Sequence, residues 1–180
     1  MSFVRYVVVS ALGFLISTGL AHAEAPSDAQ IAEIVVKANQ VDVDAGRLAM
    51  RKTATSAVKS FAAEMVAAHT QIGNEAVALV RKLGVTPEPS VTSHSLEGGG
   101  AANIALLSKL SAAQFDRAYV GHEVAYHRQV LEAVDDVLIP SAQNPELKAL
   151  LRAVRPIFIA HLEHAQHLQD SLSGTAIAPQ

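Results

Sequence analysis

The sequence predicts an all-α protein whose single domain is an antiparallel four-helix bundle. Four segments carry apolar residues at spacings of three and four, the pattern of helices that bury one face. No segment alternates apolar and polar residues over a useful length, so no strand is expected. Two of the connections are short enough to join antiparallel neighbours, and amphipathic helices joined in this way most economically form a bundle.

The first two helices are expected at 28–51 and 56–83. Gly84 is suited to cap the second helix, and Pro87 and Pro89 prevent its continuation. The expected buried faces consist of Ile31, Val35, Ala38, Ala45 and Ala49 in the first helix and of Val58, Phe61, Met65, Ile72, Ala76, Leu79 and Leu83 in the second.

An exposed linker is expected at about 85–102. This stretch is rich in Pro, Ser and Thr and ends in three consecutive glycines. The glycine run lacks the lysine of a phosphate-binding loop, so it indicates a connection and not a nucleotide site. A short helix is allowed at 103–110, after which the chain reaches the second helix pair.

The third helix is expected to begin at Ser111, whose hydroxyl can cap it, and to end at Pro140. The fourth follows Asn144, the expected N-cap, with Pro145 in its first position. Pro156 should kink this helix, because proline removes a backbone donor and crowds the preceding turn. The expected buried faces consist of Val120, Val124, Leu131, Val134 and Leu138 in the third helix and of Leu147, Leu151, Val154, Phe158, Leu162, Ala165 and Leu168 in the fourth.

Residues 1–23 have the layout of a cleavable signal peptide, which leaves 24–180 as the helical domain. Arg5 precedes an apolar run at 7–20, and the small-residue pattern at 21–23 suits cleavage. A retained membrane anchor is the alternative, but crossing a bilayer takes roughly 20 apolar residues, and this run is shorter and interrupted. Export to the periplasm or the exterior is therefore expected, with association with the outer membrane as one variant.

Charge and cysteine content exclude several function classes. The chain has 14 basic and 17 acidic residues, scattered along its length, and lacks the basic stripe that nucleic-acid binding requires. It has no cysteine, so it has no disulfide, thiolate metal ligand, cysteine nucleophile or lipid attachment site. We expect no nucleic-acid partner and no membrane-spanning segment in the exported form, and the sequence indicates no oligomeric state.

Four ionisable residues interrupt the apolar faces, one on each helix: Asp42, His69, His127 and His161. Each stands three or four residues from apolar neighbours, where a leucine would be expected. Counting about 1.5 Å per residue from the short connections places all four in the middle third of the bundle if both connections lie at the same end. Glu123, one turn before His127, and His164, beside His161, are secondary candidates.

These residues support two interpretations. Converging imidazoles predict a metal site, and a transition metal such as copper or zinc is the expected occupant. Asp42 or Glu123 would complete the ligand set or orient a ring nitrogen. Alternatively, the cluster is a purely structural hydrogen-bonded network. The protein would then be a non-catalytic envelope or stress-related protein that acts through a protein partner. No nucleophile stands beside a base, so an enzyme is not expected.

Several short motifs, in order along the chain, resemble a bacterial family of exported proteins. They are Ala38-Asn39 with Asp42, GRLA at 46–49, VKSFA at 58–62, Met65-Val66, His69-Thr70, FDRAYV at 115–120, His127 and His161-Leu162. The family is known as domain of unknown function forty-one forty-two, and its members are often labelled outer membrane proteins. The resemblance covers about 29–169 and implies a ferritin-like fold without an established activity.

The family's characteristic positions fall on Asn39, Asp42, His69, His127 and His161. Asp42 stands where the family usually has glutamate, and an alanine precedes His69 where aspartate is common. Ferritin-like folds often hold two irons with paired Glu-x-x-His motifs. Glu123 and His127 are four residues apart, so this motif is missing. A di-iron centre is therefore not expected, and a histidine-dominated mononuclear site fits better.

Overall fold

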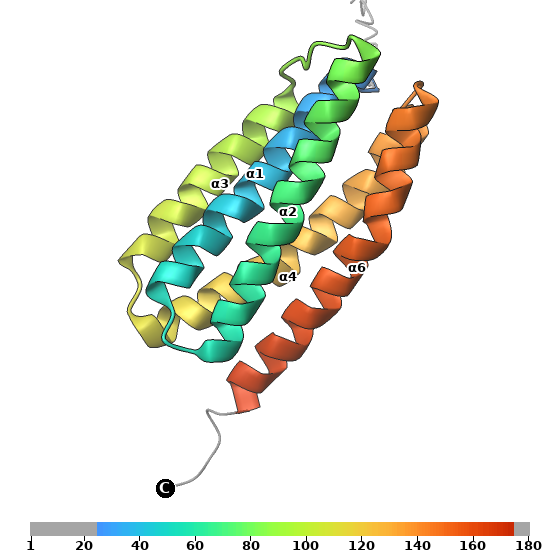
Figure 1. Cartoon of the computed structure of the whole chain (residues 1–180). Helices are drawn as coiled ribbons and strands as arrows, with labels where there is room; N and C mark the ends of the chain where they lie inside the picture. Colours follow the sequence, from blue (N-terminus) through green and yellow to red (C-terminus); the bar gives the residue numbers. More distant parts are fainter. Residues whose placement is uncertain (1–24, 175–180) are drawn as a thin grey trace, which may run out of the picture.

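The computed structural model describes residues 25–174, and the predicted signal peptide lies outside them. Within this range the chain is helical and has no strand, so the all-α prediction is confirmed (Figure 1). The long helices are α1 (Asp28–Lys52), α2 (Ser56–Leu83), α3 (Val91–Lys109), α4 (Ala112–Ala133) and α6 (Pro145–Gly174). After α4 the chain continues through a π-helical turn, η1 (Val134–Leu138), and one short helical turn, α5 (Ile139–Ser141).

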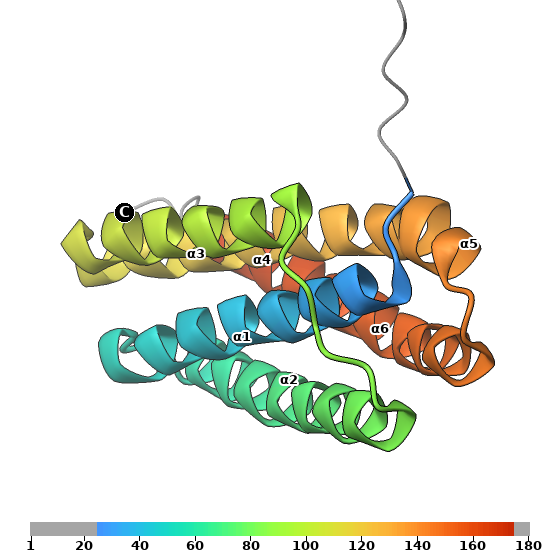
Figure 2. The same ribbon diagram turned by 90° about the horizontal axis from the view of Figure 1, so that it is seen from above.

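Four of these helices form the predicted antiparallel bundle. The helices α1 and α2 form one pair, α4 and α6 form the other, and α2 also packs against α6 (Figures 1 and 2). This arrangement agrees with the ferritin-like bundle that the sequence predicts. The remaining long helix, α3, lies outside the bundle, mainly against α1.

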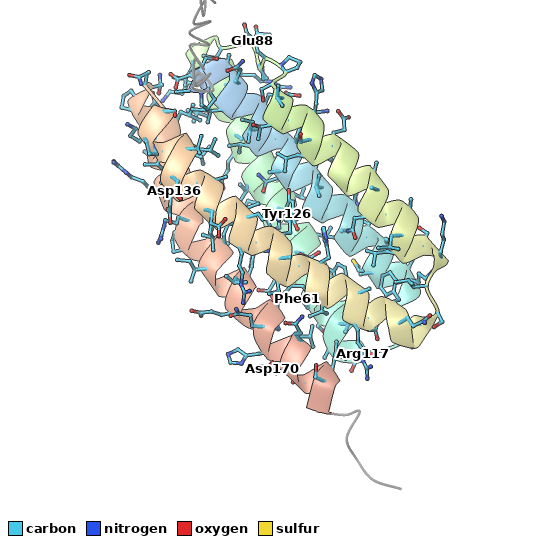
Figure 3. All side chains as sticks on the ribbon, turned by 180° about the vertical axis from the view of Figure 1, so that it is seen from behind. Phe61, Glu88, Arg117, Tyr126, Asp136 and Asp170 are labelled. Atoms are coloured by element: carbon cyan, nitrogen blue, oxygen red, sulfur yellow. The ribbon has the colours of Figure 1, made fainter. Side chains whose placement is uncertain are left out.

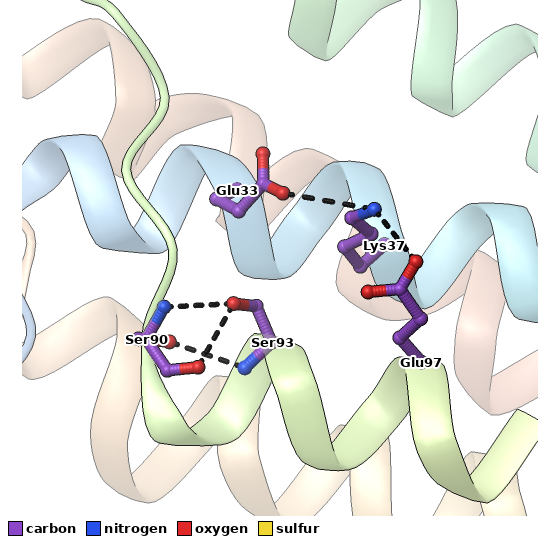
Figure 4. Close-up of polar contacts among 5 residues, drawn as sticks. All are labelled: Glu33, Lys37, Ser90, Ser93 and Glu97. Carbon is purple, nitrogen blue, oxygen red and sulfur yellow. Dashed lines mark hydrogen bonds and ion pairs between the residues drawn. The ribbon is translucent and has the colours of Figure 1, made fainter.

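The expectation of an exposed linker at 85–102 is wrong for most of that range, because the chain is already helical from Val91. Ser90 starts α3: its hydroxyl accepts from the backbone N–H of Ser93 at 3.1 Å, and the Ser93 hydroxyl accepts from the N–H of Ser90 at 2.8 Å (Figure 4). Farther along, a Cβ at Gly100 would lie 2.8 Å from Val41 Cγ2. Glycine there lets α3 lie close to α1, which explains a helix through a run that looked like a linker.

Because α3 spans the length of the bundle, the two short turns lie at opposite ends, and not at the same end as the level count assumed (Figure 1). Asp28 ties one of these turns to α1, since its carboxylate accepts from the backbone N–H groups of Gln143 and Asn144 at 2.8 Å each. The polar residues of the four bundle helices still meet, because each lies near the middle of its own helix.

The predicted helix ends are confirmed where capping chemistry defined them. Gly84 ends α2 in the left-handed region, with φ of 65°. Asn144 caps α6: its side-chain oxygen accepts from the backbone N–H groups of Glu146 at 2.9 Å and Leu147 at 3.2 Å. Pro145 is the first residue of α6, and Pro156 lies inside this helix.

The buried interior consists of two apolar clusters with a polar layer between them. One cluster lies near the α1–α2 turn and includes Phe61, Met65, Phe115 and Leu168. The other lies near the opposite end and includes Ile31, Ile72, Val134, Leu151 and Phe158. In every bundle helix the polar position falls between residues of the two clusters, so the polar layer crosses the whole bundle at mid-height.

Candidate metal centre

The polar layer brings together all four residues that the sequence singled out, and Glu123 with them. Nitrogens of His69, His127 and His161 lie within 4.8 Å of one another. Oxygens of Asp42 and Glu123 and a nitrogen of His127 form a second group within the same limit. All five side chains are at most 3% exposed. Helices α1, α2, α4 and α6 each contribute to this layer, whereas α3 contributes nothing.

Asn39 fixes the ring of His69. Its side-chain N–H donates to the carbonyl of Val35 at 2.8 Å, which directs its amide oxygen to His69 Nδ1 at 2.9 Å. An amide oxygen accepts a hydrogen bond, so Nδ1 carries the proton and Nε2 keeps a lone pair. Phe158 holds the other side of the ring, stacked at 8° with centroids 5.5 Å apart. The family resemblance marked Asn39 as a characteristic position without saying what it does, and helical periodicity gave Phe158 only a place in the core.

His127 is oriented by its own helix. Its Nδ1 lies 3.0 Å from the backbone carbonyl of Glu123, one turn earlier. A carbonyl oxygen only accepts, so this nitrogen is the donor and Nε2 has the lone pair. The rings of His69, His127 and His161 then lie with centroids 5.2–5.5 Å apart in all three pairings.

Three ring nitrogens in this layer are buried and lack a hydrogen-bond partner among residues 25–174: Nε2 of His69, Nε2 of His127 and Nδ1 of His161. Buried polar atoms almost always have a partner, so three orphans from one cluster require an explanation. In two of the rings the other nitrogen donates to an oxygen, which is the usual arrangement of a metal-binding histidine.

The buried environment keeps these imidazoles neutral. Burial, assisted by the neighbouring imidazoles, lowers the pKa of His69 to about 2 and that of His161 to about 4. Burial also lowers the pKa of His127 to about 4. At neutral pH the rings therefore carry lone pairs and no charge, the state in which imidazole binds metal ions.

The two carboxyl groups lie behind the histidine rings. Asp42 Oδ2 is 3.5 Å from His69 Nδ1, and Glu123 Oε2 is 3.6 Å from His127 Nδ1. Both carboxyls thus face the protonated nitrogens and not the unpartnered ones. Burial and the facing Glu123 raise the pKa of Asp42 well above its ordinary value, and burial raises the pKa of Glu123 to about 7.

His164 does not join the cluster, contrary to its place among the secondary candidates. It is about half exposed, its Nδ1 lies 2.9 Å from Glu64 Oε2, and its ring packs edge-on against Phe61. The three-residue spacing from His161 turns it off the core face. A groove of about 170 Å³ between α1 and α2 has His69 and Asn39 in its lining.

Comparison with known proteins identifies the fold but does not identify an activity. A crystal structure of a DUF305 fragment from Deinococcus radiodurans is similar, with a TM-score of 0.69 and 16% identity, over 79% of this chain and 95% of that chain. No protein in the curated set matches. Among residues 25–174, no helix has the length and apolarity needed to cross a membrane.

The family model for DUF4142, a domain of unknown function, matches residues 17–168. This range includes the whole polar layer and most of α6. The expected resemblance is thereby confirmed, and the protein belongs to the DUF4142 family.

Proposed function

We propose that this protein is an exported, periplasmic metal-binding protein that holds one transition-metal ion, such as copper or zinc, through His69, His127 and His161. The observation that supports this most strongly is the set of three buried histidines, each of which has an unpartnered ring nitrogen and offers a ring nitrogen within 4.8 Å of the other two. A structural network would use those nitrogens in hydrogen bonds. A metal ion at their centre would satisfy all three at once.

The surroundings suit a cation in other respects. Neutral imidazole is a ligand for copper, zinc, iron and nickel, whereas magnesium and calcium prefer oxygen. A buried dication needs negative charge nearby, and Asp42 and Glu123 supply two carboxyls close to the rings. Their positions favour an orienting and charge-balancing role over direct ligation. Paired Glu-x-x-His motifs are missing, so the site does not have the ligands of a di-iron centre.

Metal loading of the purified protein tests the proposal. The protein is stripped with a chelator, incubated separately with copper, zinc, nickel and iron, desalted, and analysed for bound metal. About one equivalent of at least one metal is expected. Less than a tenth of an equivalent of every metal, without a change in melting temperature, would exclude metal binding and leave the structural network as the explanation.

Matched triple variants locate the site. The change of His69, His127 and His161 to Ala should abolish loading. The same change at the exposed His94, His164 and His167 should leave it intact. Circular dichroism shows whether each variant folds. If the core variant folds and still binds one equivalent, the metal lies elsewhere. Fractionation of cells that produce the full-length chain tests export, and retention in the cytoplasm would contradict that part.

A further inference from the structure

A cavity of about 220 Å³ lies beside the candidate metal centre, and its lining comes from α1, α3, α4 with its π-helical turn, and α6. Its wall is mostly aliphatic, with Ile34, Val130, Leu151 and Val154 as typical members. None of the residues that line it carries a charge. The cavity therefore has no counter-ion for an anion or a cation, and it excludes both by the cost of removing them from water.

The polar groups in the inner wall already have partners. The hydroxyl of Tyr126, a residue midway along the bundle in Figure 3, donates to the carbonyl of Ala38 at 3.0 Å. Asn39 is engaged by Val35 and His69. The other polar lining residues, Thr92 on α3 and Gln129 on α4, are exposed and so lie at the mouth. A molecule inside would meet an apolar interior and a polar opening.

The π-helical turn forms part of this wall. Val134 and Leu138, its first and last residues, are both buried and both line the cavity. A π-helical turn is rare, occurs mostly as a single turn inside an α-helix, and is frequently found at functional sites. Its position here is a second feature that sets this cavity apart from an ordinary packing defect.

We propose that the cavity binds a small, uncharged, mainly apolar molecule, about the size of one six-membered ring or a six-carbon chain. An apolar cavity of about 150 Å³ is large enough for benzene, and this one is somewhat larger. Asn39 and Phe158 line it and also contact the ring of His69. The bound molecule would thus lie one side chain away from the metal centre.

Binding to the metal-free protein tests this inference separately from the metal site. The probes are toluene and 1-hexanol, with hexanoate as the charged counterpart of hexanol, followed by methyl NMR and melting temperature. We expect saturable shifts confined to the lining methyl groups. At ten times the dissociation constant the melting temperature should rise by roughly 3–6 °C. Hexanoate should bind at least tenfold more weakly than hexanol.

Substitutions at two alanines on α4 test the position of the binding site: one fills the cavity, and the other is its control. Ala133 lines the cavity, and Ala133→Leu should weaken toluene binding at least tenfold. Ala125 is exposed on the same helix, and Ala125→Leu should bind as the wild type does. Ala38→Val fills the cavity from α1 and serves if Ala133→Leu does not fold. The inference is overturned if no probe gives saturable shifts, if hexanoate binds as well as hexanol, or if the folded filled variants keep wild-type affinity.

Discussion

Asn39 provides a sharp test of the proposed metal centre, because it contacts His69 and is not one of the proposed ligands. Its amide oxygen accepts from His69 Nδ1 at 2.9 Å, and its amide nitrogen donates to the carbonyl of Val35 at 2.8 Å. Asn39→Leu keeps the branched shape and the number of heavy atoms of the side chain and removes both hydrogen bonds. His69 can then rotate or change tautomer, and its Nε2 lone pair is no longer directed to the centre of the cluster.

The expected magnitudes follow from these contacts. Loss of a partner for the buried His69 N–H should cost about 1–3 kcal/mol of folding stability in the metal-free protein. Loss of the side-chain donor to the Val35 carbonyl should cost less, because this carbonyl remains within the hydrogen-bonded helix α1. Residues that orient a metal-binding histidine are typically worth 10–100-fold in metal affinity, so Asn39→Leu should weaken binding by roughly that factor.

Competition with a chromophoric chelator measures the affinity, and two further variants interpret it. Asn39→Asp still offers an oxygen to His69 and should retain most of the affinity. Gln40→Leu alters the next residue, which is exposed and bonds only to Asp44, and should bind as the wild type does. A folded Asn39→Leu protein with an affinity within twofold of the wild type would refute the proposed role of His69 Nε2.

Three other variants test the buried carboxyls and the helix packing. Burial raises the pKa of the Glu123 carboxyl from 4.5 to about 7, so folding favours its protonated form. The metal-free wild type therefore loses stability as the pH rises from 4.5 through 7. The change Glu123→Gln removes this carboxyl. In urea denaturation, the free energy of unfolding of Glu123→Gln should exceed that of the wild type by about 3 kcal/mol at pH 8 and by almost nothing at pH 4. Parallel pH profiles of the two proteins would contradict the raised pKa of Glu123. Gly46→Ala places a Cβ 2.8 Å from Val66 Cγ2 and 3.0 Å from the Ala62 carbonyl, and should cost about 1–3 kcal/mol. Gly98→Ala meets nothing within 4 Å and should gain about 0.5–1 kcal/mol from helix propensity. Equal effects at the two glycines would argue against the close approach of α1 and α2.

The candidate site could be predicted in outline because helical periodicity is a local property. His69 stands four residues after Met65 and three before Ile72, and this spacing alone directs it to the core. The same argument applied to Asp42, His127 and His161. His164 was predicted less well, because a residue at the edge of an apolar face can turn either way, and its contact with Glu64 decides the matter.

The residues that prepare the site could not be assigned from the sequence, since their roles depend on contacts between helices. Asn39 and His69 are 30 positions apart, and Phe158 belongs to yet another helix. Nothing in a local pattern indicates which ring nitrogen has a partner and which is left unpartnered. The cavity could not be predicted from the sequence either, because residues of four separate helices and a π-turn contribute to its lining.

The sequence by itself determined the bundle helices, their capped ends and the four helices' polar positions, because these depend on side-chain spacing and on short-range backbone chemistry. Tertiary structure decided whether 91–102 would be a linker or a helix. Glycine at position 100 favours a flexible chain in isolation, but it allows a close contact between helices once Val41 lies beside it. It also decided where the short turns lie and which imidazole nitrogens have hydrogen-bond partners. Those outcomes depend on how distant segments pack, which no local pattern encodes.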